Sequence, residues 1–263
     1  MAADSDRNFI ERLTWDEVAR RIAEGATAIL PIGAAAKQHG FHLPLNTDRI
    51  QAERFAAHLA ERIDALVWPT LSYGYYPAFT AYAGSSSLSA STFEAIVHEI
   101  AAGILDGGCQ KLFVLNTGIS TLAPVERALA RVDAGKVMHL RIYEGPRYRR
   151  AAAALAMQNH GSHADELETS LMLALASQLV DMARAEASPA LKHEAPGRLT
   201  PSDKSSPNYS RSGSYGDPTL ATSGKGEVLL ASILEDLNEQ VAAFTAEPSA
   251  AKPRSNPIRS VSQ

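Results

Sequence analysis

The chain has 263 residues, 45% of them hydrophobic, and its 25 basic and 29 acidic residues give a net charge of −4. This length allows one large domain or two small ones, and the near balance of charge offers no basic surface for nucleic acid. There is no signal-peptide core, no apolar run long enough to span a membrane, and no basic amphipathic helix. We therefore expect a cytoplasmic protein that binds neither nucleic acid nor membranes. The single cysteine, Cys109, excludes an intramolecular disulfide and a zinc site built from cysteines.

Short apolar runs alternate with amphipathic stretches along the first two thirds of the chain. We expect strands at 27–33, 65–69, 111–116 and 136–144. We expect helices at 13–25, 47–63, 89–108, 125–135 and 165–180. Capping-box spacing marks two helix starts, at Thr14 with Glu17 and at Ser91 with Glu94. This alternation predicts an α/β protein with three α/β/α layers and a central, mostly parallel sheet.

We expect residues 1–245 to form a single domain, because no linker or repeat interrupts them. The stretch 187–217 is rich in Pro, Ser and Gly, and a loop of this length in a compact domain is usually functional or mobile. It is either a lid or a long surface loop. Residues 246–263 have the composition of a disordered tail.

One predicted strand-to-helix connection concentrates polar side chains. It holds His39, His42 and Asp48, whose imidazoles and carboxylate are ligands for Zn²⁺, Mn²⁺ or Fe²⁺. Ligands of parallel α/β sheets bind at the carboxyl ends of the strands, so this loop and the one after 111–116 should be neighbours. A structural role for both histidines is the alternative. Lys37 in the same loop needs an explanation, because its charge would repel a metal ion.

A second candidate group stands at the start of the helix predicted at 165–180. His163 and Glu166 are three residues apart, which lets them share a helix face, whereas Glu168 lies on another side. Acidic residues are also favoured in a first helical turn by the helix dipole, so a structural role for either glutamate stays open.

Three segments together carry a resemblance to a known family. They are "LPIGAAAKQHGFHLPLNTD" at 30–48, "SHADELETSLMLAL" at 162–175 and "SGSYGDPTLATSGKG" at 212–226. In this order they resemble the signature segments of the creatininase family, and the resemblance runs from about Leu13 to Leu237. It implies a layered α/β fold, hydrolysis of amide-type bonds in small molecules, a metal centre that is usually dinuclear, and a homo-oligomer, often a hexamer.

The resemblance also implies roles for individual residues. His39 matches the loop histidine that binds metal, Asp48 the aspartate that bridges two metals, and His42 a neighbouring histidine that contacts ligand or substrate. Glu166 and Glu168 match two late glutamates, of which we favour Glu168 as the metal ligand. His163 matches a late histidine with an acid–base or substrate-contact role.

Two positions depart from the family pattern. Lys37 stands where the family has its first glutamate, and Gly118 stands where it has a histidine, although Asn116 keeps its place. Both missing ligands serve the same metal in the family. We therefore predict one divalent ion (Zn, Mn or Fe) on His39, Asp48 and Glu168, with the Lys37 ammonium in place of the other ion.

The predicted activity is hydrolysis of an amide-type C–N bond. His163 or Glu166 would act as general acid or base, with Lys37 beside them. Tyr76 lies in an aromatic stretch that the family places beside the substrate, so we expect Tyr76, His42 and Asn116 to contact it, and an aromatic or planar substrate is one inference. The alternative is a catalytically inactive relative that acts as a binding or assembly subunit.

Overall fold

A four-stranded parallel sheet lies at the centre of the computed structural model, which describes residues 5–188 and 197–246. In spatial order its strands are β2 (Leu66–Val67), β1 (Ala28–Ile32), β3 (Leu112–Asn116) and β4 (Val137–Arg141). Each lies within a stretch that the sequence predicts as a strand, and all three pairings are parallel. The prediction of a parallel sheet is confirmed.

Helices and short 3₁₀ turns connect the strands. The α-helices of the described residues are α1 (Trp15–Ala23), α2 (Thr47–Ile63), α3 (Ala90–Asp106), α4 (Leu122–Leu129), α5 (Pro146–Leu155), α6 (Glu166–Ala176) and α7 (Ser223–Ala246). The 3₁₀ turns lie at Ser5–Asn8, Ile10–Arg12, Pro77–Phe79, Ser177–Leu179, Met182–Arg184 and Pro218–Leu220. All five predicted helices are present. The sequence did not predict α7 as a helix, and two early glycines weaken its helical pattern.

The two predicted capping boxes have different outcomes. At α1, Thr14 and Glu17 form the reciprocal bonds of the box. At α3 the prediction is wrong, because the cap is Ser89, whose Oγ accepts from the Thr92 amide at 3.2 Å. Glu94 is engaged elsewhere, in an ion pair with Arg127.

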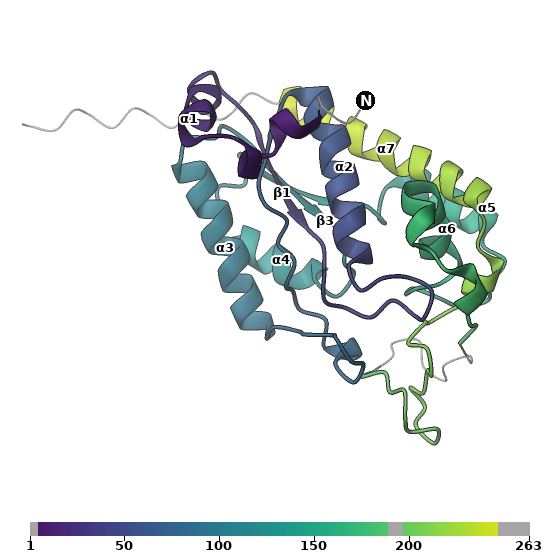
Figure 1. The fold of residues 1–263 in the computed structure, drawn as a ribbon. Coiled ribbons are helices and arrows are strands. Elements are labelled where there is room, and N and C mark those ends of the chain that lie inside the picture. The colour runs from purple at the N-terminus through teal and green to yellow at the C-terminus, as the bar shows by residue number, and fades with distance from the viewer. Residues whose placement is uncertain (1–4, 189–196, 247–263) are drawn as a thin grey trace, which may run out of the picture.

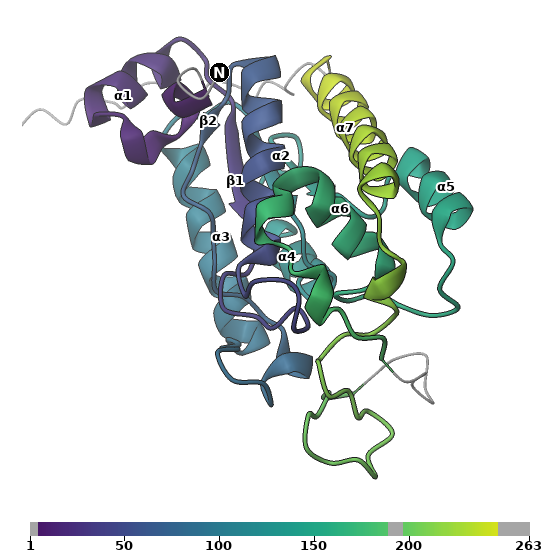
Figure 2. The ribbon, with the colours of Figure 1, turned by 45° about the vertical axis from the view of Figure 1, so that its right-hand side comes forward.

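Different helices cover the two faces of the sheet, because successive strand residues point to opposite sides. Ile29 and Phe113 pack in one core with residues of α2 and α7. Leu30 and Val114 pack in a second core with residues of α3 and α4. Figure 1 shows α2 and α3 on either side of β1, and Figure 2 shows α5, α6 and α7 grouped on the side away from α1. The predicted three-layer α/β/α architecture is therefore confirmed.

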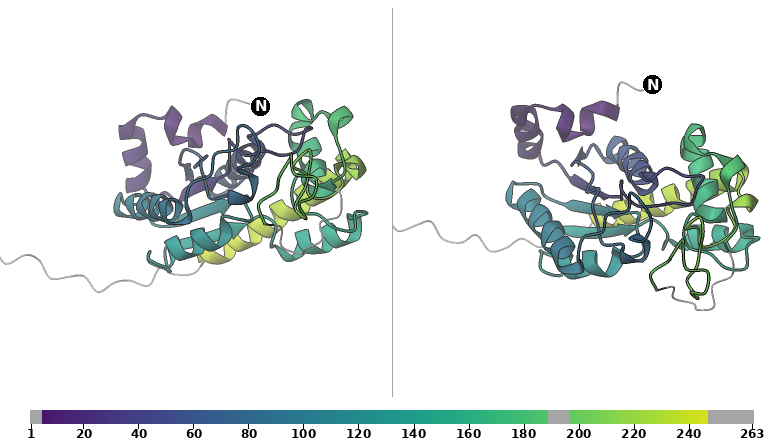
Figure 3. Two further views of the ribbon diagram at one scale, coloured as in Figure 1. Left: turned by 90° about the horizontal axis from the view of Figure 1, so that it is seen from below. Right: turned by 60° about the horizontal axis from the view of Figure 1, so that its bottom comes forward.

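The carboxyl ends of β1 and β3 lie side by side. Ile32 is the register partner of Asn116, and the Thr117 hydroxyl donates to the carbonyl oxygens of Ile32 and Asp48, both at 3.1 Å. The loops that follow these strands are thus neighbours, as the sequence predicts. Figure 3 views the molecule from below, toward this end of the sheet.

The described part of the stretch 187–217 packs against the loop after β1 and the segment between β2 and α3. The Gln38 side-chain amide donates to the Gly213 carbonyl at 2.9 Å, and the Tyr82 hydroxyl donates to the Ser210 carbonyl at 2.6 Å. Residues 189–196 and 247–263 lie outside the described residues, so the lid, the tail and the single-domain boundary stay predictions. Within the described residues, no helix is both long and apolar enough to cross a bilayer.

Candidate active site

His39 is fully buried in the loop between β1 and α2. Its Nδ1 lies 2.9 Å from the carbonyl oxygen of Lys37. Its Nε2 lies 3.0 Å from Oδ1 of Asp48 and 3.8 Å from Oε1 of Glu168. One imidazole therefore meets two carboxylates that come from two different helices.

Asp48 projects from the first turn of α2, and its two carboxylate oxygens contact two different side chains. Its Oδ2 lies 2.7 Å from Nζ of Lys37, while its Oδ1 faces His39. Burial alone would raise the pKa of the Asp48 carboxyl, but the Lys37 ammonium and the His39 ring bring it below its ordinary value. The Lys37 ammonium also lies 5.2 Å from the centre of the Phe79 ring, a cation–π distance.

Glu168 stands in the first turn of α6, and the backbone before that helix fixes its position. Asp165 caps α6 by accepting hydrogen bonds from the amides of Leu167 and Glu168 at 3.0 and 2.9 Å. Ala164 has a left-handed φ of 46°, which turns its amide toward Oε2 of Glu168 at 2.6 Å. Glu168 is held with Oε1 toward His39 in the loop after β1 and Oε2 toward the segment before α6.

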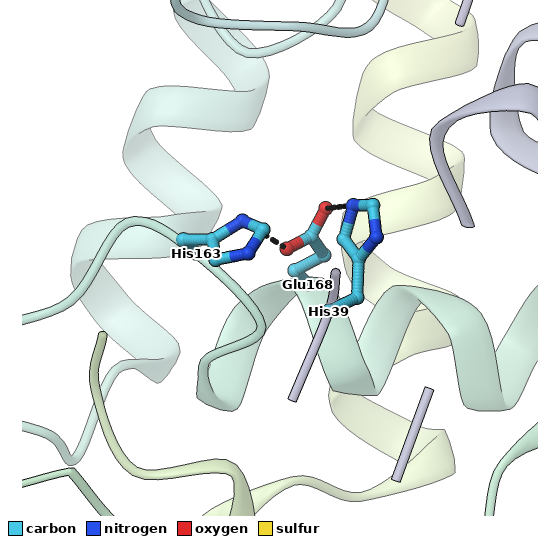
Figure 4. Close-up of side chains that lie close together, drawn as sticks. All are labelled: His39, His163 and Glu168. Atoms are coloured by element: carbon cyan, nitrogen blue, oxygen red, sulfur yellow. Dashed lines mark ion pairs between the residues drawn. The ribbon is translucent and has the colours of Figure 1, made fainter. Parts of the chain in front are cut away.

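His163 comes from the segment before α6 and faces Glu168 from the side opposite His39. Its Nε2 lies 2.8 Å from the Gln38 carbonyl oxygen, and its Nδ1 lies 3.8 Å from Oε2 of Glu168. Its ring packs on Phe79 with centroids 4.2 Å apart. Figure 4 shows the Glu168 carboxylate between the two imidazoles, with one oxygen toward each.

These side chains form a group that fits a metal ion. Ligand atoms of His39, His163 and Glu168 all lie within 4.8 Å of one another. Two imidazoles with a carboxylate are a donor set that zinc and manganese accept. The loop after β1 and the start of α6 thus bring together residues that are more than 120 positions apart in the sequence.

A cavity of about 460 Å³ opens beside this group. His163, Asp165 and Glu168 contribute to its wall, and so do Thr117 and Ser120 from the loop after β3. Its aromatic and aliphatic lining comes from Phe79, Ile119, Tyr143, Tyr148, Leu167, Leu199 and Tyr215. A concave, mostly apolar space with a few convergent polar groups is the usual form of a small-molecule site.

Sequence and structure comparisons agree on the family. The family model for creatininase, described as creatinine amidohydrolase, matches residues 11–241. The chain belongs to the creatininase family. It is 30% identical to the creatinine amidohydrolase of Pseudomonas putida over 247 residues, which are 84% of this chain and 91% of that protein. The prediction of family membership is confirmed.

The chain is also similar to a peptidase and to several solved structures of the creatininase family. The mycofactocin precursor peptide peptidase of Mycobacterium ulcerans is 28% identical, with 84% of this chain and 86% of that protein covered. A crystal structure of creatinine amidohydrolase superposes with a TM-score of 0.79 at 26% identity, covering 92% of this chain and 99% of that one. Two further creatininase structures at 26% identity are a manganese form and a mutant of Zn–Zn type.

The structure places Glu166 away from the group around Glu168. Its Oε2 accepts from the amides of Met157 and Gln158, both at 2.8 Å, and its Oε1 is paired with the ammonium of Lys225 on α7. The carboxylate is completely buried and is not part of the cavity wall. These contacts indicate that Glu166 joins α6 to α7 and to the segment after α5.

The three predicted substrate contacts also lie outside the cavity lining. Nε2 of His42 lies 2.8 Å from the Thr169 hydroxyl of α6, and burial lowers the pKa of His42 to about 4. Tyr76 is buried, and its hydroxyl has no hydrogen-bond partner among the described residues. Asn116 shapes the turn after β3, because its Oδ1 accepts from the Gly118 amide at 3.0 Å and the Thr121 hydroxyl at 2.8 Å.

Two residues that the sequence analysis missed support Glu168. The Tyr143 hydroxyl donates to Oε1 of Gln51 at 2.6 Å, and Nε2 of Gln51 lies 3.5 Å from Oε1 of Glu168. Gln51 is fully buried on α2, and Tyr143 lines the cavity. The spacing of Asp48 and Gln51 was the available signal, because residues three apart lie on the same helix face.

Proposed function

We propose that this chain is a metal-dependent hydrolase of an amide-type C–N bond in a small molecule, with one divalent ion per chain. The observation that carries this proposal is the convergence of His39, His163 and Glu168, of which His163 and Glu168 also line the adjacent cavity. Family relatives support it, since they include a creatinine amidohydrolase and a peptidase, and solved creatininases contain manganese or zinc.

His39 and Glu168 would hold the ion, with Oδ1 of Asp48 beside His39. Zinc, manganese or iron at this position would supply Lewis acidity, which makes an amide carbonyl more electrophilic and water more acidic. The Lys37 carbonyl orients the His39 ring, and the Ala164 amide together with Gln51 orients Glu168. The chain therefore contributes fixed ligands and an adjacent cavity in which the substrate can be oriented.

Lys37 is the reason that we propose one ion rather than two, because its ammonium takes the place of a second ion beside Asp48. Its ammonium makes a 2.7 Å ion pair with the carboxylate oxygen that faces away from His39, and both side chains are buried. A lysine ammonium carries one positive charge and three hydrogen-bond donors, so it neutralises Asp48 without metal. Gly118 supplies no ligand on this side, and its position is crowded: a Cβ there would lie 2.6 Å from the Thr121 hydroxyl.

The cavity favours a compact substrate with a flat, apolar part. Tyr143, Tyr148 and Tyr215 line it together with Phe79, and tyrosine offers flat apolar area with a polar end. The sequence predicts that the ring of Tyr76 contacts the substrate. The lining supports the same kind of substrate through a different set of rings, only one of which, Phe79, comes from the predicted aromatic stretch.

The proposal includes a cytoplasmic homo-oligomer, with a hexamer as the expected state. It rests on the resemblance to the creatininase family. Light scattering coupled to size-exclusion chromatography tests the assembly, and a monomer at micromolar concentration would contradict it.

Metal analysis combined with an amide screen tests the proposed function. Protein purified without chelator or a metal-binding tag should contain about one equivalent of zinc, manganese or iron per chain. It should hydrolyse at least one member of a panel that includes creatinine, other cyclic amides, formamides and short peptides. A chelator should abolish turnover and the metal should restore it, and the His39→Ala variant should lack both metal and turnover.

Two other results would redirect this proposal. Two equivalents of metal per chain would contradict the one-ion assignment and the role of Lys37. No metal, even after incubation with each candidate ion, would favour the alternative of an inactive binding or assembly subunit whose Lys37–Asp48 pair replaces the metal chemistry.

A further inference from the structure

The hydrogen bonds of His39 fix the role of each ring nitrogen. A backbone carbonyl only accepts hydrogen bonds, so the contact of Nδ1 with the Lys37 oxygen at 2.9 Å requires a proton on Nδ1. Nε2 lies 3.0 Å from Oδ1 of Asp48, a carboxylate that also only accepts, and 3.8 Å from Oε1 of Glu168. Without metal a proton therefore occupies the space between Nε2 and the carboxylates, and a metal ion would take the place of that proton.

His163 repeats this arrangement with its nitrogens exchanged. Its Nε2 donates to the Gln38 carbonyl oxygen at 2.8 Å, so the lone pair of the neutral ring is on Nδ1. Nδ1 lies 3.8 Å from Oε2 of Glu168, which is too long for a hydrogen bond. Carbonyls of two consecutive residues, Lys37 and Gln38, therefore orient both rings so that the other nitrogen of each faces the Glu168 carboxylate.

This is the arrangement that metal-binding histidines adopt, with the outer N–H donated to a carbonyl and the inner nitrogen left for the metal. In Figure 4 the Glu168 carboxylate lies between the two rings, one oxygen toward each. An acid–base histidine would need its free nitrogen toward the substrate. Nδ1 of His163 instead faces Glu168, which is held in place by the Ala164 amide.

We infer, on the basis of the proposed function, that His163 is a protein ligand of the metal ion through Nδ1. The ion is then held by His39, His163 and Glu168. Asp48 is mainly the partner of Lys37, with which it shares a 2.7 Å ion pair. His163 adds a ligand to the retained ion, and it does so from the segment before α6 rather than from the turn at Gly118.

Zinc affinity, measured by competition with a chromogenic chelator, separates ligation from proton transfer. The His163→Gln variant should bind zinc more weakly by over about 100-fold, since even an outer hydrogen-bond partner of a ligand contributes about 10–100-fold. The matched control is His98→Gln, which removes an imidazole from α3 on the opposite face of the sheet. It should change zinc affinity by less than about threefold, which is below the 10–100-fold effect of losing a hydrogen-bond partner of a metal ligand.

A second measurement uses the wild-type protein, so it does not depend on the folding of a variant. Long-range ¹H–¹⁵N spectra of the histidine rings should show zinc on Nδ1 of His163 and on Nε2 of His39. Cobalt-substituted protein should change its visible absorption when His163 is replaced by Gln and not when His98 is.

The outcomes distinguish this inference from the proposed function. Wild-type zinc affinity in His163→Gln, with turnover lost, would overturn the inference and return His163 to an acid–base role, while the proposed function stands. An Nδ1 signal of His163 that does not respond to zinc would overturn it as well. Failure of the wild-type protein to bind any divalent ion would overturn both.

Discussion

Lys37 and Asp48 form a buried ion pair, with Nζ 2.7 Å from Oδ2, between the loop after β1 and the first turn of α2. The pair explains how a cation fits among the proposed metal ligands. The ammonium lies on the side of Asp48 away from His39, whose Nε2 contacts the other oxygen. The carboxylate therefore separates Lys37 from the proposed ion.

Replacing Lys37 by Met should destabilise the metal-free protein strongly. The substitution leaves the Asp48 carboxylate buried without its partner, and breaking a buried pair costs about 3–5 kcal/mol. Urea unfolding at neutral pH measures this loss, with the exposed Lys204→Met as the control. The double variant Lys37→Met with Asp48→Asn should recover part of the loss. A loss below about 1 kcal/mol, the range of surface pairs, would contradict a buried pair.

Replacing Lys37 by Glu should allow a second ion to bind. The glutamate adds a carboxylate next to Asp48 and removes the ammonium charge, so oxygen donors surround the position that the ammonium fills. Metal titration followed by elemental analysis should give more than one equivalent per chain. Lys37→Gln is the matched control, because it has the length of glutamate without its charge and should keep one equivalent. Unchanged stoichiometry in the glutamate variant would count against Lys37 as a substitute for an ion.

The fold was largely predictable, because it rests on local periodicity. The strands are short apolar runs and the helices have one apolar face. Both patterns can be recognised within a short stretch of the sequence. The choice between neighbouring hydroxyls at the α3 cap was not predictable. Ser89 directly precedes the helix and caps it, whereas Ser91 lies in the first turn and Glu94 pairs with Arg127.

The site was predictable only in part, because helical spacing does not apply across a helix boundary. His163 and Glu166 share a face only if both are helical, but Ala164 is left-handed and Asp165 is the extended cap of α6. This geometry brings Glu168 toward His163 and turns Glu166 to Lys225. The preference for Glu168 as the metal ligand rests on the family resemblance. The spacing of three residues from His163 would instead have favoured Glu166.

Gln51 should be a positioning residue for Glu168. The Tyr143 hydroxyl donates to its Oε1, which leaves Nε2 directed at Oε1 of Glu168. Gln51→Leu should weaken zinc affinity by about 10–100-fold, the usual cost of losing a partner of a metal ligand. Tyr143→Phe should have a smaller effect in the same direction, measured by the same chelator competition.

Tyr82→Phe is the matched control for Tyr143→Phe. It removes a hydroxyl that donates at the same distance of 2.6 Å, but to the Ser210 carbonyl outside the site. It should leave zinc affinity unchanged within about threefold, well below the effect of losing a ligand partner. Equal effects of the two tyrosine variants would show that the change reflects general stability rather than the position of Glu168.

Glu166→Gln should lower stability without changing metal affinity. Its carboxylate is completely buried, and the substitution leaves the Lys225 ammonium without its charged partner. Breaking such a pair costs about 3–5 kcal/mol, which urea unfolding detects. Glu168→Gln should show the reverse, a large loss of zinc affinity with a smaller loss of stability. A fully stable Glu166→Gln protein that binds metal but lacks turnover would support the catalytic role that the sequence suggested.

Stability should also depend on pH through His139, which lies on β4 away from the cavity lining. Burial, followed by the charge of Arg141, lowers the pKa of His139 to about 4 from 6.5. Between these values the unfolded chain binds more protons than the folded one, so the free energy of unfolding rises with pH in this window. The contribution is complete above pH 6.5 and is lost as the pH falls toward 4.

His139→Gln should therefore flatten the pH dependence of unfolding. A shift of this size corresponds to about 2–3 kcal/mol, because each pKa unit is worth about 1.4 kcal/mol. The amide of glutamine does not titrate in this range, while its oxygen is still able to accept from the Asn116 side chain, as the ring nitrogen does at 3.3 Å. Urea unfolding of wild-type and variant protein should give curves with a constant offset above about pH 6.5 that change relative to one another as the pH falls, because only the wild-type protein loses stability there. Parallel curves would mean that the folded protein protonates His139 as readily as the unfolded chain does.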